Sequence, residues 1–173
     1  FTSSTSASNT QTTGTVTIAL GATGASSNRL NINATGIAPG DTMQRSFDLT
    51  NSGSINLASI TLTTTASPSS LLDTDATNGL QMLIEKCSVA WTESGSSPAF
   101  TYTCGGSTST VLATRAVIGS ALSLSNLGST TAGTTDHLRL TLSLPGTAGN
   151  TFQNISSSIT FAFTGTQRNG TNK

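Results

Sequence analysis

Apolar side chains recur at every second position in several short stretches of this chain. In the clearest stretch, Leu138, Leu140, Leu142 and Leu144 alternate with polar residues. The same period of two recurs in segments 16–20, 43–49, 60–62, 80–84 and 159–163. Because successive side chains of a β-strand point to opposite faces, this period predicts strands with one apolar face and one polar face.

Turn-forming residues separate these stretches. Pro39-Gly40-Asp41 and Asn51-Ser52-Gly53 bracket the second predicted strand, and Pro145-Gly146 ends the leucine-rich one. Segment 111–127 fits neither the strand period nor the helix period well, and we predict one short helix there. Six or more short strands predict an all-β, antiparallel β-sandwich, jelly-roll-like or immunoglobulin-like, with at most one or two short helices.

The composition narrows the classes of function. Only 8% of the 173 residues are charged, against about 25% in an average globular domain. Lys plus Arg and Asp plus Glu number seven each, whereas Ser and Thr together make up 61 residues. A chain with no net charge and no basic run is not expected to bind nucleic acid or a membrane surface. No apolar stretch approaches the roughly 20 residues of a spanning helix, so we predict no membrane-spanning segment.

The chain opens with a polar segment of low complexity. Its first ten residues are Phe1, Thr2, Ser3, Ser4, Thr5, Ser6, Ala7, Ser8, Asn9 and Thr10. Such a start is typical of a mature secreted chain after removal of a signal peptide. The segment is too polar to fold alone, but it can pair as a strand with the edge of another sheet. We therefore divide the chain into an N-terminal arm (1–12), one β-sandwich domain (13–168) and a C-terminal tail (169–173).

The two cysteines lie in predicted strands on either side of a hairpin connection. Cys87 opens segment 87–91 and Cys104 ends segment 100–104, with the loop 92–99 between them. Paired strands can bring two Cα atoms within bridging distance, which favours a disulfide and an oxidising, extracellular setting. The alternatives are two free thiols in the core, or half of a metal site.

The chain lacks most of the residue patterns that catalytic sites use. His137 is the only histidine, and Asp136 beside it would point to the other face of a strand. The chain has neither a Gly-x-Ser-x-Gly elbow nor a His-Glu-x-x-His motif. We interpret His137 as a strand-end residue that is bonded locally or exposed, and we predict no enzymatic activity, no catalytic metal and no cofactor.

A cluster of oxygen-bearing side chains resembles part of a calcium loop. Asp73, Asp75 and Asn78 precede Gly79. In an EF-hand loop that starts at Asp73, glycine would be sixth and glutamate twelfth, but Gly79 is seventh and Ile84 is twelfth. A polar turn that leads into the next strand is the favoured interpretation, with calcium as the alternative.

Covalent modification has a few candidate positions. Asn33, Asn154 and Asn169 each begin an Asn-x-Ser/Thr sequon, which matters only if the host glycosylates secreted proteins. Lys86 is a candidate for an isopeptide crosslink to an asparagine, but nothing in the sequence places a partner beside it.

Several segments together resemble one family. Segment 36–57 resembles a turn, strand and turn common in surface-exposed β-sandwich domains. The order Ala-Gly-Asn-x-x-Gln at 148–153, then the phenylalanine strand 159–163 and Thr-Gln at 166–167, resembles the end of TasA/camelysin-family proteins. The polar arm running into 15–20 resembles the mature start of that family, and the cysteine pair resembles its cysteine-bearing branch.

The resemblance implies a secreted jelly-roll subunit of cell-surface or biofilm-matrix filaments. In such filaments the N-terminal segment of one subunit is added as a strand to the next subunit, which is called donor-strand complementation. Expected partners are further copies of the chain and cell-surface anchoring or capping proteins. We expect the first ten residues to form the donor strand and Phe1, its only large apolar residue, to occupy a pocket on the neighbour.

Two other functions compete with this one. The first is a monomeric adhesin or carbohydrate-binding module, in which Trp91, Phe100 and Tyr102 near the cysteines would stack on sugar rings. The second is a metallopeptidase, a label often given to camelysin-like proteins. The chain lacks paired histidines for a metal, which argues against the second.

Overall fold

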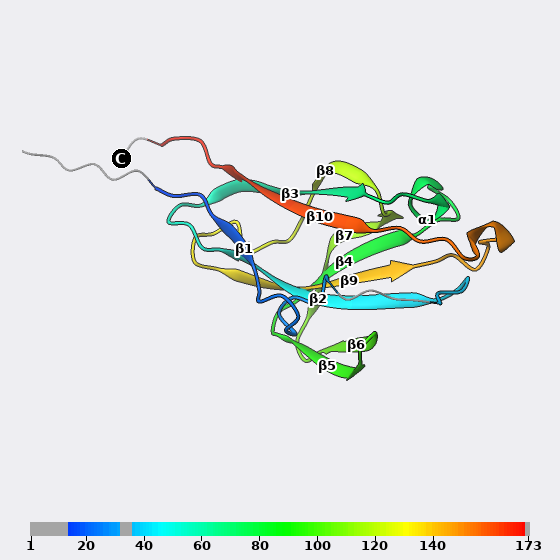
Figure 1. Cartoon of the computed structure of the whole chain (residues 1–173). Coiled ribbons are helices and arrows are strands. Elements are labelled where there is room, and N and C mark those ends of the chain that lie inside the picture. Colours follow the sequence, from blue (N-terminus) through cyan, green and yellow to red (C-terminus); the bar gives the residue numbers. More distant parts are fainter. Residues whose placement is uncertain (1–13, 32–35, 172–173) are drawn as a thin grey trace, which may run out of the picture.

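The computed structural model describes residues 14–31 and 36–171 and shows two antiparallel sheets packed face to face (Figure 1). The five-stranded sheet has the order β1 (Ile18–Leu20), β2 (Thr42–Asn51), β9 (Thr135–Ser143), β4 (Gln81–Cys87) and β7 (Thr108–Ala116). The three-stranded sheet has the order β10 (Ile159–Gln167), β3 (Leu57–Ala66) and β8 (Gly119–Ser123). The predicted all-β sandwich is confirmed.

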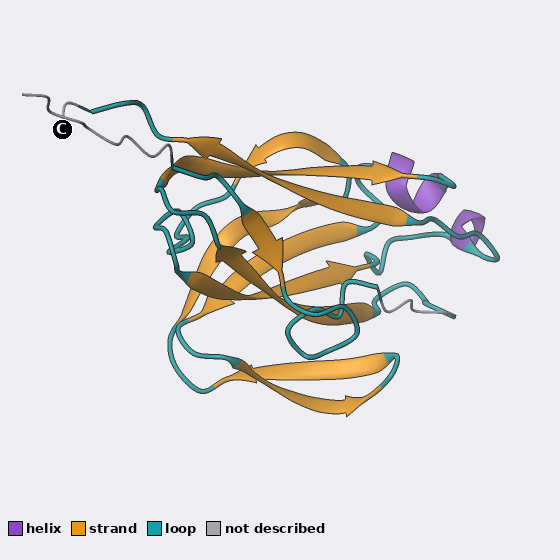
Figure 2. Ribbon diagram, turned by 60° about the vertical axis from the view of Figure 1, so that its left-hand side comes forward, coloured by secondary structure: helices purple, strands orange, loops and turns teal. Residues whose placement is uncertain are grey.

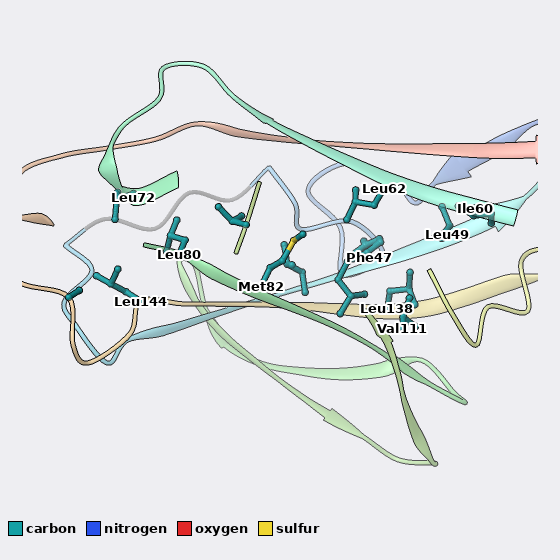
Figure 3. Close-up of a cluster of buried hydrophobic side chains, with 14 of the residues drawn as sticks. Phe47, Leu49, Ile60, Leu62, Leu72, Leu80, Met82, Val111, Leu138 and Leu144 are labelled. Atoms are coloured by element: carbon teal, nitrogen blue, oxygen red, sulfur yellow. The ribbon is translucent and has the colours of Figure 1, made fainter. Parts of the chain in front are cut away.

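The core lies between the two sheets and follows the predicted alternation. Phe47, Leu62, Met82 and Leu138 are almost fully buried and point toward one another from four strands (Figure 3). Arg45 shares the inward face of β2 with Phe47 and is only 5% exposed. Burial lowers the pKa of its guanidinium. The inward face of β2 therefore includes one charged residue, Arg45, between Met43 and Phe47.

The predicted helix in segment 111–127 is wrong. This segment forms most of β7, a corner at Val117 and the strand β8. Two shifts in register between β4 and β7 break the period of two in β7. Val117 is fully buried, and its backbone N–H donates to the carbonyl of Leu80. The two helical turns found among the described residues lie elsewhere, in α1 (Leu71–Thr74) and η1 (Asn150–Phe152).

A separate hairpin lies against the outer face of the five-stranded sheet (Figure 2). It is made of β5 (Trp91–Ser96) and β6 (Ala99–Cys104), so strand pairing extends through most of the loop expected at 92–99. Only Ser97 and Pro98 form the turn, because Ser96 pairs with Ala99. The hydroxyls of Ser94 and Thr101 also hydrogen-bond across the strands, at 2.8 Å. The strand expected at 87–91 is likewise two elements, since β4 ends at Cys87 and β5 begins at Trp91.

The sandwich has two distinct ends along the strand direction (Figure 1). We call the end formed by residues 14–15, 52–56 and 168–171 the Gly14 pole. We call the opposite end, formed by 39–41, 71–78 and 145–152, the α1 pole. Strands β2 and β10 run from the α1 pole to the Gly14 pole, and β1 runs the other way because it is antiparallel to β2.

Candidate functional site

One edge of the sandwich carries a long strand with an unpaired side. Among the described residues, β10 pairs only with β3, and none of its nine residues is charged. Ser158, which precedes it, exchanges backbone hydrogen bonds with Ser67 and Pro68 on the β3 side. Because alternate residues of a strand turn their backbone groups to the same side, Phe161 and Phe163 present theirs to the free edge. The charged or proline residues that usually protect an edge strand are absent from β10.

The inward side chains of this edge strand are only half-buried. Ile159, Phe161 and Phe163 point between the sheets yet stay partly exposed, whereas their neighbour Phe47 is 1% exposed. The centroids of the Phe47 and Phe163 rings lie 5.4 Å apart. A cavity of about 120 Å³ opens here and is lined by Ile18, Ala19, Leu20, Leu49, Phe161 and Phe163. The edge is therefore a groove with apolar walls, which we call the β1–β10 groove.

The short strand β1 leaves this groove open. Its three residues pair only with Leu49, Thr50 and Asn51 at the end of β2. Beyond them, the N–H of Asp48 donates to the carbonyl of Ser27, so a loop and not a strand borders the rest of β2. On the opposite side of the sandwich, the corner at Val117 joins β7 directly to β8, and the Ser125 N–H after β8 donates to the Val111 carbonyl of β7 at 3.0 Å.

A glycine sets the width of the groove at its Gly14-pole end. A Cβ atom at Gly165 would lie 2.9 Å from Leu57 Cδ1 and 3.4 Å from Ile18 Cγ2. The absence of a side chain lets Ile18 pack directly over β10. The groove is thus narrowed by Ile18 at this end.

The chain that precedes β1 is fixed where its description begins. Gly53 donates its N–H to the Thr17 carbonyl at 3.1 Å, and Ser54 donates to the Thr15 carbonyl at 3.0 Å. A Cβ atom at Gly14 would lie 2.0 Å from Ile55 Cγ2, so only glycine fits there. The backbone is thereby held at the Gly14 pole. The expected donor strand, Phe1 to Thr10, lies outside the described residues.

The two cysteines form a disulfide, as predicted. Cys87 at the end of β4 is bonded to Cys104 at the end of β6, with their Cα atoms 5.6 Å apart. The bond ties the β5–β6 hairpin to the five-stranded sheet at the hairpin's base. It leaves no free thiol for a metal site in the chain.

Removing this bond is expected to lower the stability. Replacing both Cys87 and Cys104 by Ser should lower the free energy of unfolding by about 3 kcal/mol, the chain-entropy value for a closed loop of this size. Urea unfolding at pH 7 measures the loss. A matched Ser94→Ala variant, which removes only the exposed hydroxyl pair within the hairpin, should lose less than about 1 kcal/mol. Equal losses in the two variants would contradict the expectation.

Two arginines hold the hairpin onto the sheet. Arg29 forms a bidentate ion pair with Glu93, with N–O distances of 2.6 and 2.9 Å, and its guanidinium lies 4.7 Å from the centroid of the Phe100 ring. The hydrogen bond from Arg29 holds the pKa of Glu93 below its usual value. Arg139 pairs with Glu85 and lies 4.4 Å from the centroid of the Trp91 ring.

The aromatic side chains expected to stack on sugars are already in contact with other side chains of the protein. A guanidinium covers one face of Trp91 and of Phe100, and the Trp91 Nε1–H donates to the carbonyl of His137 at 3.0 Å. Tyr102 is 5% exposed and donates its hydroxyl to Glu93 at 2.9 Å. These rings pack the hairpin against the sheet and do not form an open platform for carbohydrate.

His137 and Asp136 point to opposite faces of β9. His137 Nδ1 lies 2.7 Å from Asp48 Oδ1 on the outer face, so the acid that orients the ring comes from β2. The sequence gives no signal for this long-range pair. Among the described residues, no serine or threonine hydroxyl hydrogen-bonds to the ring, so a nucleophile for a catalytic triad is missing there.

Asp136 is buried on the inner face of β9. It accepts hydrogen bonds from the N–H groups of Gly128 at 3.0 Å and Ser129 at 2.7 Å, and Lys86 Nζ lies 3.2 Å away. Burial raises the pKa of Asp136, but these hydrogen bonds outweigh it and the net shift is downward. Lys86, considered above for a crosslink to asparagine, is therefore in an ion pair with an ionised carboxylate.

The carboxylates considered for calcium have other partners. Asp73 caps α1, accepting from the Ser70 N–H and from the hydroxyls of Ser69 and Ser157. Asp75 accepts from the N–H groups of Thr77 and Asn78 in the following turn. Asp73 stabilises the start of α1 and Asp75 stabilises the turn that follows it. This agrees with the interpretation of the segment as a polar turn.

Two of the three candidate glycosylation positions lie at the surface. Asn154 and Asn169 are exposed and lie in loops. Asn33 lies outside the described residues.

A family model described as camelysin metallo-endopeptidase matches residues 1–172 of the chain. No curated protein matches the chain. That description implies a metal, but the donor set does not fit one. The chain has a single histidine, paired with Asp48, and two cysteines joined in a disulfide. In the described part of the chain, no group of three His, Cys, Asp or Glu side chains comes together.

No helix among the described residues is long and apolar enough to cross a membrane. The match spans essentially the whole chain, from the polar start through both cysteines to the end of β10. The protein belongs to the camelysin/TasA family.

Proposed function

We propose that this protein is a structural, non-enzymatic subunit of an extracellular cell-surface or biofilm-matrix filament. Family membership supports a secreted, fibre-type matrix protein in general. In the proposal, subunits polymerise head to tail by donor-strand complementation through residues 1–12, and cell-surface anchoring or capping proteins are further partners. The observation that carries the proposal is the free, uncharged edge of β10 above the half-buried side chains of the β1–β10 groove.

A strand added at this edge would both hydrogen-bond to the free backbone groups of β10 and cover its apolar side chains. It pairs with the backbone groups that Ile159, Phe161 and Phe163 present to the free side, and it covers their partly exposed side chains. Each paired backbone group contributes roughly 1 kcal/mol net, and the apolar burial adds to this. The Ser- and Thr-rich arm has small side chains that suit a narrow groove, and Phe1 is the proposed occupant of the cavity beside Phe161.

Head-to-tail assembly fixes the direction of the added strand. The arm is joined to the sandwich at Gly14, at the Gly14 pole. In a head-to-tail stack along the strand direction, this pole faces the α1 pole of the next subunit. The arm's residues 12 to 1 then run toward that subunit's Gly14 pole, as β10 does, so the arm is antiparallel to β10. The 13 residues before Gly14 reach about 40 Å when extended, more than the roughly 30 Å of β10. Because donor and acceptor are different surfaces, the contact does not close and a filament propagates.

Deleting residues 1–12 tests the proposal. The intact protein should form filaments in negative-stain electron microscopy, and the truncated protein should stay monomeric because it has no donor strand. A third variant, with Gly and Ser at all twelve positions, keeps the length of the arm and should also fail to polymerise. A peptide of residues 1–12 should raise the melting temperature of the truncated protein by filling its groove. Filaments of the truncated protein would overturn the proposal.

A further inference from the structure

The ionised side chains on the flank of the sandwich are largely neutralised in pairs. Arg29 pairs with Glu93 and Arg139 pairs with Glu85 beneath the hairpin. Lys86 of β4 pairs with Asp136 of β9 on the inner face of the five-stranded sheet. Of the other charged groups of the described residues that are exposed or partly exposed, Asp48 pairs with His137 on the outer face, Arg168 lies at the Gly14 pole, and Asp41, Asp75 and Arg115 lie at or beside the α1 pole.

The Gly14 pole carries a cation beside a hollow. Arg168 donates to the Asn169 carbonyl at 2.9 Å and to the Thr171 hydroxyl at 3.3 Å, and within the described ranges it forms no ion pair with a carboxylate. It lines an open cavity of about 380 Å³ together with Ser54, Ile55, Asn56 and Thr171. The hollow adjoins Gly14, where the backbone is held against Ile55.

The α1 pole carries two carboxylates that reach the surface, Asp41 and Asp75. Asp41 is exposed and accepts from the Ala38 N–H at 2.7 Å. Asp75 is partly exposed, and hydrogen bonds from the Asn78 and Thr77 N–H groups lower its pKa. Neither forms an ion pair within the described ranges.

Two further charged groups lie at the α1 pole. Asp73 is 6% exposed and is occupied by the cap of α1. The cation Arg115 turns its guanidinium to the carbonyls of Ala116 and Ile118. Counted over Asp41, Asp73, Asp75 and Arg115, this pole is net negative.

We propose that the Arg168 hollow of one copy receives the Asp75 turn, residues 75–78, of the next copy. This interface deepens the proposed function and rests on it. A concave, positive end and a negative turn at the far end of the same molecule are complementary in a head-to-tail stack. Opposite charges on docking faces accelerate encounter and suppress the reversed orientation. The arm enters the neighbour's β1–β10 groove at the α1 pole. The proposed interface places the start of the arm beside that entrance.

Charge reversal and charge exchange test this interface in the full-length protein. Arg168→Glu should raise the critical concentration for filament formation roughly tenfold, because it replaces an attraction by a repulsion. Asp75→Lys should act in the same direction, and the double variant should restore assembly to within about threefold of the wild type. Asp75→Asn keeps the acceptor for the turn and should give a smaller loss. High salt should weaken wild-type nucleation and shrink the difference between the wild type and Arg168→Glu.

Arg115→Glu is the matched control, since it makes the same charge change at the α1 pole. It should not raise the critical concentration, and circular dichroism checks that each variant is folded. Normal assembly of Arg168→Glu, or failure of the double variant to recover, would overturn the interface. The donor-strand proposal would still stand if the variant lacking residues 1–12 failed to assemble. A wild type that forms no filaments would overturn both.

Discussion

Replacing Phe161 by Lys is expected to abolish filament formation while leaving a folded monomer. Phe161 points into the β1–β10 groove and is only half-buried, so in the free subunit the lysine amine can reach water past the open edge. A docked donor strand would cover that route and force the ammonium group out of water. An inward-pointing charge on an edge strand is a device by which natural sheets prevent strand addition. The effect on assembly should therefore far exceed the effect on stability.

The neighbouring residue provides the control. Ala162→Lys introduces the same side chain one position along β10, on the outer face and away from the groove. It should assemble like the wild type in electron microscopy and in light scattering. Phe161→Leu should keep partial assembly, because it retains an apolar wall. Equal inhibition by both lysine variants would show that charge anywhere on β10 blocks assembly and would remove the groove from the explanation.

The strands and their inward faces were accessible from the sequence. The alternation of Leu138, Leu140 and Leu142 in β9 depends only on the two-residue period of a strand with one buried face. The pairing of Cys87 with Cys104 was also accessible, because a hairpin between them brings their ends together. These features are local in sequence, which is why pattern and spacing are enough to predict them.

Features that depend on the pairing of distant segments could not be predicted from the sequence. The register shifts between β4 and β7 hide the strand period of β7, so the segment fits neither template. Asp48 and His137 meet only because β2 and β9 are neighbours, although they are 89 positions apart. The free edge of β10, which we propose as the acceptor, also depends on long-range pairing. Sequence shows that 159–163 is an apolar strand, but its place beside only one partner follows from the topology of both sheets.

Replacing Asp136 by Ala is expected to cause a large loss of stability. The carboxylate is 3% exposed and serves three donors, the N–H groups of Gly128 and Ser129 and the ammonium of Lys86. Removing one partner of a buried ion pair leaves the other charge uncompensated, which costs about 3–5 kcal/mol. The control is Asp48→Ala, a carboxylate on the outer face of the same sheet that is 29% exposed. It should lose less than about 1 kcal/mol.

The loss caused by Asp136→Ala should also depend on pH in a defined direction. Because the folded pKa of Asp136 lies below the unfolded value of about 3.9, the ionised carboxylate stabilises the fold at every pH above that value. The contribution is lost as the pH falls through the folded pKa. Urea unfolding of both proteins between pH 7 and pH 2 should show a constant difference down to about pH 4 and a shrinking one below it. A difference that stays constant across the acid range would mean that Asp136 acts by filling space and not by its charge, and the account of its three donors would then be wrong.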